Sequence, residues 1–199
     1  TVSDTVAPVI SLNGSAALTV ECSGAYNDEG AAASDACAGS VSVTADGSVN
    51  TSAVGVYTLT YSASDGNGNS ADEVTRVVTV SDTTKPVITL GGSAAVTVEC
   101  AGVYTDAGAT ASDVCAGSLS VTMDGSVNTA AVGAYTLTYS ATDGVNAADE
   151  VTRAVTVVDT AAPVLSLTGP ESFEVIQGTA YTDPGAFAWD ACMGDLTAS

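Results

Sequence analysis

Aspartate residues recur along this chain at loop positions where they could hold a metal ion. In the first part of the sequence they are Asp4, Asp35 and Asp65. The equivalent positions further along are Asp82, Asp113, Asp143, Asp159 and Asp190. Carboxylate oxygens are the hard ligands that calcium prefers, so the pattern predicts calcium sites. The alternative is that these residues form turns and cap strands in contact with solvent.

An internal repeat positions these residues. The segment 46–51 returns unchanged as 124–129. Tyr26, Tyr104 and Tyr181 mark the period, which is 78 residues and then 77 (104 − 26 and 181 − 104). A duplicated unit of this length is a domain, and domains in tandem usually form a stalk.

The motif Asp-Thr-x-x-Pro opens each repeat and divides the chain into four parts. They are the tail of a preceding repeat (1–3), a first repeat (4–81), a second repeat (82–158) and a partial third repeat (159–199). Each proline stands at the start of a predicted strand, where its missing N–H costs least. Because the opening residues match the ends of the repeats, we interpret the chain as a window from a longer array.

Strand patterns dominate the sequence. Tyr57, Leu59 and Tyr61 alternate with threonine, and this period of two is typical of a half-buried strand. About seven short strands in a repeat of this length predict an all-β fold of tandem Ig-like β-sandwich domains, arranged as a rod. In such a fold Tyr57 and Tyr135 are predicted to form tyrosine corners. The strands expected in the first repeat are 8–12, 17–22, 30–35, 40–45, a short piece near 48–52, 55–64 and 72–80.

The repeats resemble two related families in their motifs. Tyr-Thr-Asp-x-Gly-Ala and Gly-x-Tyr-x-Leu-x-Tyr-x-Ala-x-Asp-Gly are similar to bacterial Ig-like repeats of pesticidal crystal proteins and surface proteins. Ala33-Ser-Asp-Ala-Cys37 and its counterparts ending at Cys115 and Cys192 resemble the hyalin repeat. The resemblance implies an Ig-like sandwich, an extracellular adhesive or spacer role, and no enzymatic activity. One departure is the last hairpin of the second repeat, where Val145 replaces the usual glycine.

Composition excludes several kinds of function. The chain has 23 acidic and 3 basic side chains, a formal net charge of −20 and no histidine. A polyanionic partner such as nucleic acid needs basic clusters that are absent, and the same holds for anionic membrane surfaces. Without histidine, Ser-His-Asp catalysis and His-ligated zinc are ruled out in this window. No apolar run approaches the ~20 residues of a membrane span, so we expect no direct membrane insertion.

The Ig-like fold predicts that loops carrying the aspartates meet. The incoming linker, the loop after the strand that ends near residue 35, and the last hairpin loop share one end of such a sandwich. Three carboxylates converging there, such as Asp4, Asp35 and Asp65, would repel one another unless a cation lay between them. We therefore expect an interdomain calcium ion that stiffens each junction.

Five cysteines in an apparently secreted chain suggest disulfides. We prefer pairing within repeats, Cys22–Cys37 and Cys100–Cys115, which leaves Cys192 alone. Pairing across junctions is one alternative, with Cys22–Cys115, Cys100–Cys192 and Cys37 bridging to the preceding unit. Reduced thiols are another. The predicted strands place Cys22 and Cys37 at opposite ends of the sandwich, which favours the cross-junction pairing. A shift of the strand ends by a few residues keeps the within-repeat pairing open.

Two arginines supply most of the positive charge. Arg76 and Arg153 lie on the same strand face as valines, and a cation there needs a carboxylate partner. Glu21 and Glu99 lie on an early strand that commonly neighbours the last one. We predict the cross-strand ion pairs Glu21–Arg76 and Glu99–Arg153, with a structural role.

These observations predict an extracellular structural or adhesive protein, either secreted or on the cell surface, that forms a stalk or a filament subunit. Its expected partners are adjacent Ig-like repeats or identical subunits. The alternative is a carbohydrate- or protein-binding accessory module of a larger secreted enzyme. Trp189 and Phe187 would serve that role if exposed, but we prefer to explain them by re-packing in the core of a diverged repeat.

Overall fold

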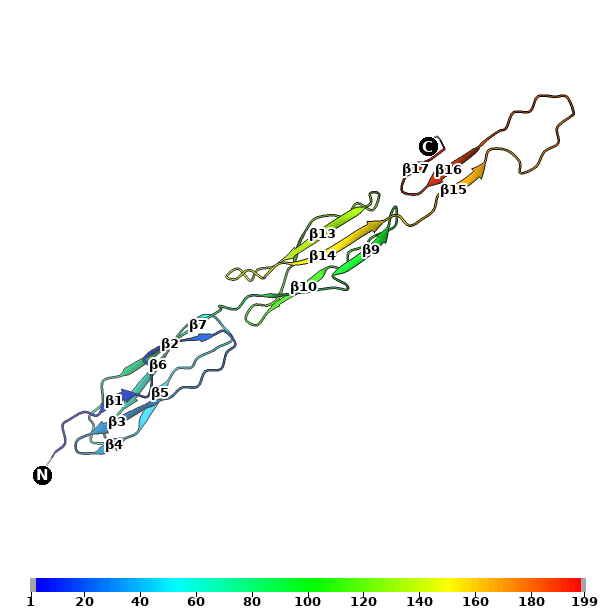
Figure 1. Ribbon diagram of the computed structural model, residues 1–199. Coiled ribbons are helices and arrows are strands. Elements are labelled where there is room, and N and C mark those ends of the chain that lie inside the picture. Colours follow the sequence, from blue (N-terminus) through cyan, green and yellow to red (C-terminus); the bar gives the residue numbers. More distant parts are fainter. Residues whose placement is uncertain (1–2, 198–199) are drawn as a thin grey trace. The chain divides into compact units, whose positions relative to one another are not determined.

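Strands make up the regular structure of the computed structural model, which describes residues 3–197 (Figure 1). Seventeen strands and no helix occur in that range, so the predicted all-β class is confirmed. Within the same range no helix is long and apolar enough to cross a membrane. Two of the three residues predicted as a preceding tail (1–2), and the last two of the partial third repeat (198–199), lie outside the described residues.

The first repeat folds as two sheets around a small shared core. One sheet has the order β1–β3–β4, and the other has the order β2–β7–β6–β5. Neighbouring strands are antiparallel except β2 and β7, which run parallel. The strands are β1 (Val9–Leu12), β2 (Ala17–Glu21), β3 (Ala31–Asp35), β4 (Gly39–Val41), β5 (Val43–Asp46), β6 (Gly55–Ala63) and β7 (Val74–Ser81).

Two predicted strands of this repeat differ from the structure. The segment predicted as 40–45 is two strands, because the chain passes from one sheet to the other at Ser42. The short piece predicted near 48–52 is a turn, in which the side-chain oxygen of Asn50 accepts the backbone N–H of Ser52 at 3.1 Å. Asparagine commonly stabilises turns through this bond, which competes with strand pairing.

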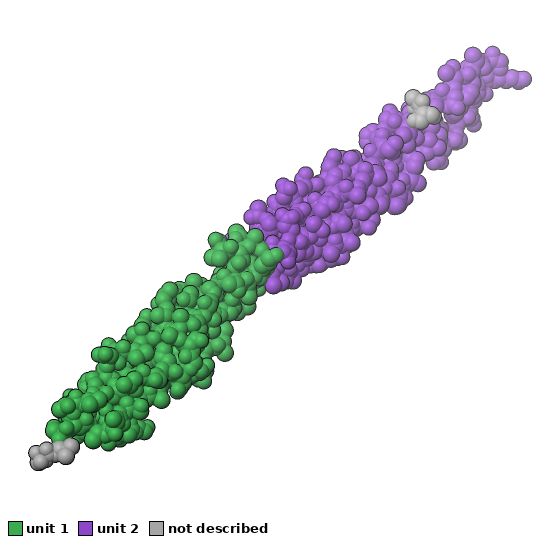
Figure 2. Space-filling view, turned by 60° about the vertical axis from the view of Figure 1, so that its left-hand side comes forward, with its two compact units in different colours: residues 1–86, 112–119, 142–147 green, residues 87–111, 120–141, 148–199 purple. Residues whose placement is uncertain are grey.

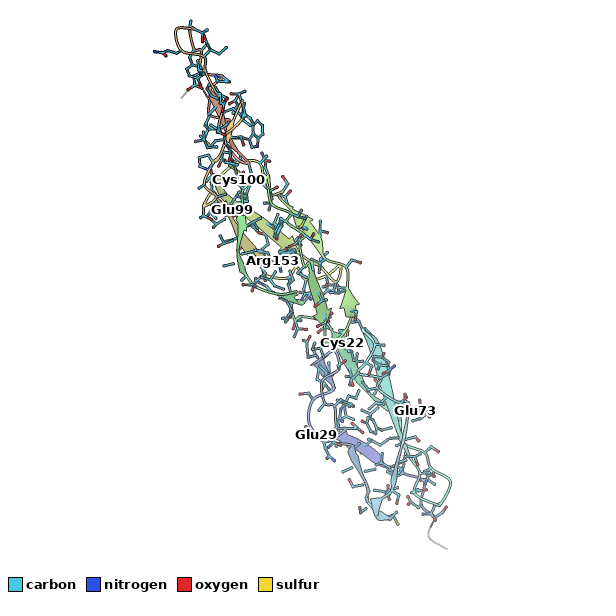
Figure 3. All side chains as sticks on the ribbon, turned by 90° about the vertical axis from the view of Figure 1, so that its right-hand side faces the viewer. Cys22, Glu29, Glu73, Glu99, Cys100 and Arg153 are labelled. Atoms are coloured by element: carbon cyan, nitrogen blue, oxygen red, sulfur yellow. A yellow bond between two sulfur atoms is a disulfide. The ribbon has the colours of Figure 1, made fainter. Side chains whose placement is uncertain are left out.

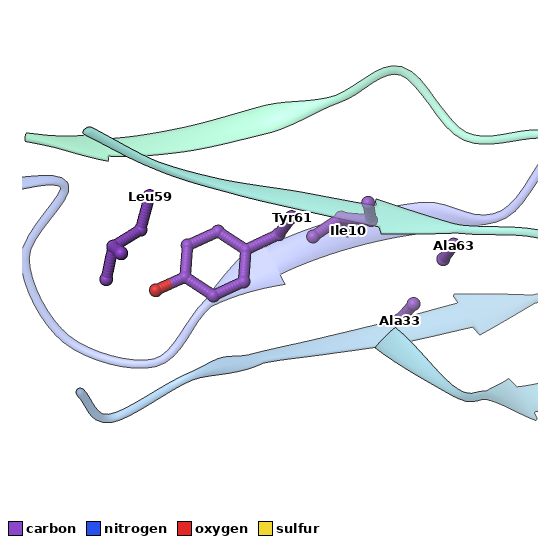
Figure 4. Close-up of a cluster of buried hydrophobic side chains, with 5 residues drawn as sticks. All are labelled: Ile10, Ala33, Leu59, Tyr61 and Ala63. Atoms are coloured by element: carbon purple, nitrogen blue, oxygen red, sulfur yellow. The ribbon is translucent and has the colours of Figure 1, made fainter. Parts of the chain in front are cut away.

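The core of the first repeat draws on both sheets. Leu59, Tyr61 and Ala63 alternate along β6 and point inward, where they meet Ile10 of β1 and Ala33 of β3 (Figure 4). The period of two read from the sequence therefore identified the buried face of β6. Burial of this apolar surface is the main force that holds the two sheets together.

The predicted tyrosine corners are present in both repeats. The hydroxyl of Tyr57 donates to the carbonyl of Ala53 at 2.8 Å. The hydroxyl of Tyr135 donates to the carbonyl of Ala131, also at 2.8 Å. Each bond fixes the turn that leads into the strand on which its tyrosine lies.

A buried arginine organises one end of each core. Arg76 is 2% exposed and pairs with Asp28, and Arg153 is 1% exposed and pairs with Asp106. The hydroxyl of Tyr61 donates to Oδ1 of Asp28 at 2.6 Å. Burial, and then this hydrogen bond, raise the pKa of Tyr61 to about 12. A buried charge needs such partners, so the role of these residues is structural.

The predicted ion pairs Glu21–Arg76 and Glu99–Arg153 are therefore wrong. The prediction that these strands are neighbours is correct, because β2 pairs with β7. Their parallel register, however, places Glu21 opposite Ser81 and carries its carboxylate away from Arg76. The carboxylate partner of Arg76 is instead Asp28, which lies between β2 and β3.

The second repeat has the same topology as the first. Its sheets have the orders β11–β10–β8 and β12–β13–β14–β9, and β9 runs parallel to β14. The third repeat has one described sheet, in the order β15–β16–β17. The strands are β8 (Val87–Leu90), β9 (Ala95–Glu99), β10 (Ala109–Asp113), β11 (Gly117–Leu119), β12 (Thr122–Asp124), β13 (Gly133–Ser140), β14 (Val151–Val158), β15 (Val164–Leu167), β16 (Ala186–Asp190) and β17 (Gly194–Asp195).

Compact units divide the chain differently from the sequence repeats. One unit contains residues 1–86 together with two segments of the second repeat, 112–119 and 142–147 (Figure 2). The other unit contains the rest of the chain. The first unit thus holds the first repeat, with Asp4, Asp35 and Asp65. It also holds the segments of the second repeat that carry Asp82, Asp113 and Asp143.

Candidate functional site

Three segments of the first compact unit bring aspartates together. They are the linker that begins at Asp82, the turn that follows β10 at Asp113, and the loop between β13 and β14 that contains Asp143. One carboxylate oxygen of each residue lies within 4.8 Å of those of the other two. We call Asp82, Asp113 and Asp143 the aspartate cluster. The predicted convergence of these three residues is therefore present.

Asp113 anchors the turn after β10. The residue is 8% exposed, and its Oδ1 accepts the backbone N–H of Cys115 at 2.6 Å and of Ala116 at 2.9 Å. The bond from Ala116 is the largest cause that lowers the pKa of Asp113, whereas the charge of Asp143 raises it. Because the net effect is to lower the pKa of Asp113, its carboxyl group is ionised at neutral pH. One oxygen thus has the turn-forming role that we considered as the alternative to metal binding.

Asp143 has one satisfied and one unsatisfied oxygen. Its Oδ1 accepts the backbone N–H groups of Val145 and Asn146, each at 2.6 Å, and these bonds lower its pKa, with that from Asn146 the larger cause. Its Oδ2 is buried and has no hydrogen-bond partner among the described residues. The side-chain amide of Asn146 donates to the carbonyl of Asp82 at 3.2 Å and is a smaller cause that lowers the pKa of Asp143. A buried acceptor without a partner is unusual in a folded protein.

Thr84 provides a hydroxyl beside the aspartate cluster. Its Oγ1 lies 3.3 Å from Oδ1 of Asp82 and 3.4 Å from Oδ2 of Asp113. A hydroxyl carries one hydrogen, so it can donate to one of these oxygens at a time. The described contacts therefore leave the cluster with more acceptors than donors.

The corresponding residues of the first repeat are arranged differently. Oδ2 of Asp65 accepts a hydrogen bond from the side-chain amide of Asn69 at 2.5 Å, and the same amide donates to the carbonyl of Asp4 at 3.2 Å. Asp35 repeats the turn of Asp113, and its Oδ2 is buried without a partner among the described residues. Within residues 3–197, the 4.8 Å criterion is met by the aspartate cluster and not by Asp4, Asp35 and Asp65.

The third repeat supplies fewer ligand positions. Oδ1 of Asp190 accepts the backbone N–H of Cys192 at 2.8 Å and of Met193 at 2.9 Å, as in the other two repeats. Among the described residues, Asp159 and Asp190 do not belong to a group of three possible ligands. The turn-forming role is therefore common to three repeats, whereas the close carboxylate group belongs to the second.

The disulfides connect different repeats. Cys22 is bonded to Cys115 and Cys100 to Cys192, with Cα–Cα distances of 5.5 and 5.4 Å (Figure 3). Cys37 is free and exposed. The preferred pairing within repeats, Cys22–Cys37 and Cys100–Cys115, is thus wrong, and the structure has the cross-junction alternative.

The strand ends give the physical reason for this pairing. Cys22 follows β2, and its N–H donates to the carbonyl of Ser81, the last residue of β7. Cys37 follows β3 beside the start of β1, where Ser34 is the partner of Val9. A disulfide requires Cα atoms within about 7 Å. Cys22, beside the end of β7, and Cys37, beside the start of β1, lie at opposite ends of the repeat and therefore cannot pair.

The two glutamates that were predicted to pair with arginines hold the linkers instead. The carboxylate of Glu21 accepts the hydroxyl of Thr83 at 2.6 Å and its backbone N–H at 2.9 Å. The carboxylate of Glu99 accepts the same two groups of Thr160, at 2.8 and 2.7 Å. The hydroxyl of Thr83 is the largest cause that lowers the pKa of Glu21, and the backbone N–H of Thr160 is the largest for Glu99. These contacts between a glutamate and a linker threonine had one sequence signal, which is the repeated pair Glu-Cys followed some 60 residues later by Asp-Thr.

Comparison with known proteins identifies the domains. A family model described as "Bacterial surface protein, Ig-like domain" matches residues 10–80 and 88–157, more than half of the chain. No curated protein matches the sequence. A solved structure, the lipoprotein BT2262 from Bacteroides thetaiotaomicron, is similar at 16% identity over 73% of this chain and 97% of that chain. Its TM-score of 0.35 is too low to carry an argument.

Proposed function

The chain belongs to the bacterial surface protein Ig-like domain family, and on that premise we propose that it is an extracellular structural module, a stalk or a filament subunit. The two matched domains confirm the predicted tandem bacterial Ig-like repeats. Domains of this family are typically non-catalytic and belong to surface proteins. The observation that supports the proposal best is the disulfide Cys22–Cys115, because a covalent bond between repeats serves a mechanical role.

Several contacts reinforce this disulfide within the first compact unit. Next to Cys22, the carboxylate of Glu21 holds Thr83 of the linker by two hydrogen bonds. On its other side, the hydroxyl of Ser23 donates to the carbonyl of Val114 at 3.2 Å. The disulfide therefore provides a second covalent connection in parallel with the linker, and polar contacts on both sides restrict its motion. Such an arrangement favours a stalk that transmits load from one repeat to the next.

The free cysteine suggests which partner such a stalk takes. Cys37 occupies the position of Cys115 and Cys192, and each of those is bonded to a cysteine that follows the second strand of another repeat. The turn around it is also the same, because Oδ1 of Asp35 accepts the N–H of Cys37 at 2.7 Å. These similarities support an adjacent Ig-like repeat as the partner of the first repeat.

The proposal is tested by freeing the linker from the disulfide. Replacement of Cys22 and Cys115 by alanine should broaden the distribution of interrepeat orientations, measured by small-angle X-ray scattering of the non-reduced full chain. The matched control is Cys37→Ala, which removes a cysteine without breaking either disulfide. An unchanged scattering profile in the double variant would argue against a load-bearing joint.

A second candidate function, carbohydrate binding by an accessory module, is favoured by an exposed aromatic pair. Phe187 and Trp189 are 45% and 55% exposed and alternate along β16, so they share one face of the strand. Their positions in the repeat correspond to Ala32 and Ser34 of β3, which are also exposed. The pair thus lies on the outer face, which supports a binding role over re-packing in a core. Two neighbouring aromatic rings are a common platform for stacking on sugars.

Trp189 is the one tryptophan of the sequence, so its fluorescence reports directly on this platform. Titration with soluble bacterial and plant polysaccharides should shift or quench the emission of the full chain if the aromatic pair binds sugar. Phe187→Ala should weaken that response, whereas Phe173→Ala, outside β16, should leave it unchanged. No spectral response to any of these sugars would remove the second candidate.

A further inference from the structure

We propose that the aspartate cluster, Asp82, Asp113 and Asp143, is a calcium site. The proposed role of the ion, which is to stiffen a stalk, rests on the proposed structural function. Binding of the ion can be measured independently of that function. Nothing in the family assignment specifies a metal. The site would fasten three segments of the chain at one point.

The strongest observation is the buried oxygen of Asp143. Oδ2 of this residue is inaccessible to solvent and accepts no hydrogen bond from the described residues, while Oδ1 already accepts two. An ionised carboxylate oxygen in that position needs either a donor or a cation, since an unpaired buried acceptor costs free energy. Oδ2 is therefore the atom of Asp143 that is available as a metal ligand.

The other two aspartates complete the anionic group to which Asp143 belongs. Asp113 is 8% exposed, and two backbone N–H groups hold its carboxylate in place. Asp82 enters from the linker, and its carbonyl is fixed by the amide of Asn146. Three carboxylates within 4.8 Å repel one another, and among the described contacts of residues 3–197 Thr84 offers one hydrogen to two of them. A divalent cation would reverse the sign of this interaction.

The first repeat shows what replaces a cation when a donor is present. Its hairpin loop, residues 65–69, is one residue longer than the equivalent loop 143–146. The extra length lets the amide of Asn69 reach Oδ2 of Asp65, so that oxygen has a hydrogen-bond donor. In the second repeat Asn146 donates to the backbone of Asp82, and Oδ2 of Asp143 stays without a donor. We therefore expect calcium to bind at the loop of Asp143 and not at the loop of Asp65.

The ligand chemistry favours calcium over other metals. All three side chains offer hard oxygen atoms, and Cys115, two residues after Asp113, is in a disulfide with Cys22. Zinc and the softer metals prefer thiolate and imidazole ligands, which this site lacks. Calcium accepts six to eight oxygens in flexible geometry, whereas magnesium demands near-ideal octahedral coordination. Loops from three segments suit the more flexible ion.

The site is tested by calcium titration of the full, non-reduced chain with isothermal calorimetry, with magnesium as the competing ion. We expect one calcium site, and Asp143→Asn should weaken its affinity at least tenfold. The control Asp65→Asn, at the equivalent position of the first repeat, should leave the affinity unchanged. Asp82→Asn, in the linker, is a second test that does not alter the hairpin loop and should also weaken binding at least tenfold.

Three results would overturn the proposal: no binding heat at millimolar calcium, equal affinity in the wild type and both cluster variants, or an equal loss in Asp65→Asn. Each of these outcomes leaves the disulfide-based stalk intact, because the scattering comparison of the cysteine variants does not depend on calcium. Conversely, the titration could detect calcium binding while the cysteine variants leave the scattering unchanged. That result would contradict the proposed stalk and support the metal site.

Discussion

The equivalent loops of the first and second repeats are almost the same in sequence and differ in what they bond to. In the first, Asn69 satisfies Asp65 and Cys37 is free. In the second, Asp143 keeps an oxygen without a donor and Cys115 is bonded to the first repeat. The loop that is one residue shorter therefore leaves Asp143 without the donor that Asp65 has, while Asp35 and Asp143 each keep one buried oxygen without a partner. The comparison teaches that the differences between these repeats concentrate where one repeat follows another.

The largest expected difference between the two repeats is the change in the free energy of unfolding when the cysteine of each equivalent turn is replaced. Cys22→Ala with Cys115→Ala releases a connection across 93 residues, which should lower the free energy of unfolding by about 2–4 kcal/mol. Cys37→Ala in the equivalent turn should change it by less than about 0.5 kcal/mol, as expected for an exposed site. Urea unfolding under non-reducing conditions measures both. Equal effects of the two changes would break the comparison.

Alkaline pH should affect the two repeats alike, because the buried tyrosines have the same surroundings. Burial, and then the bond to the neighbouring aspartate, raise the pKa of both Tyr61 and Tyr139 to about 12. A raised pKa of the folded state stabilises the protein below the ordinary value near 10, and this contribution is lost as the pH rises toward 12. Two pKa units correspond to about 2–3 kcal/mol per tyrosine.

Ultraviolet titration at 295 nm follows this ionisation. Tyr61→Phe and Tyr139→Phe should each remove one late-titrating group, and the two variants should give the same curve. A difference between the curves would show that the cores of the two repeats are less alike than their sequences.

Replacement of the hairpin loop of the second repeat by that of the first should remove the expected calcium response. Replacement of Val145 by Asn-Gly copies residues 65–69 into the second repeat and should abolish the rise in melting temperature that the proposed calcium site predicts. The magnitude lost equals RT ln(1 + [Ca²⁺]/Kd), about 2.7 kcal/mol at a calcium concentration of 100 Kd. Differential scanning fluorimetry with calcium and with chelator measures it. A retained response would place the ion elsewhere.

The smallest expected effect concerns the linker of the first repeat. Val6 stands where the second repeat has Thr84, whose hydroxyl lies 3.4 Å from Asp113. Val6→Thr should supply a donor to the unpartnered oxygen of Asp35 and raise the melting temperature slightly, by the contribution of one hydrogen bond. Val132→Thr, another exposed valine, is the control and should have no such effect.

The strands, the sandwich and the tyrosine corners could be predicted from the sequence because local patterns encode them. Alternation along β6 reported which side chains face the core, and the repeat confirmed it by duplication. The partners of Cys22 and Arg76 could not be predicted in the same way, because they depend on strand direction and register. The parallel pairing of β2 with β7 decides both, and no local pattern reports it.

The aspartate cluster was predicted as a set of loops at one end of a sandwich, and the structure brings its three members together. The difference between Asp65 and Asp143 could not be predicted, because both asparagine amides donate to a linker carbonyl and only the geometry shows that Asn69 also reaches Oδ2 of Asp65. The loop shorter by one residue, visible as a period of 77 instead of 78, was the only sequence signal.

The central claim is that function lies where one repeat is covalently fastened to the next, and peptide mapping of the native, non-reduced protein tests it most directly. Proteolysis with blocked thiols, followed by mass spectrometry, should recover Cys22 linked to Cys115 and Cys100 linked to Cys192. Recovery of Cys22 linked to Cys37, or of Cys100 linked to Cys115, would contradict the account.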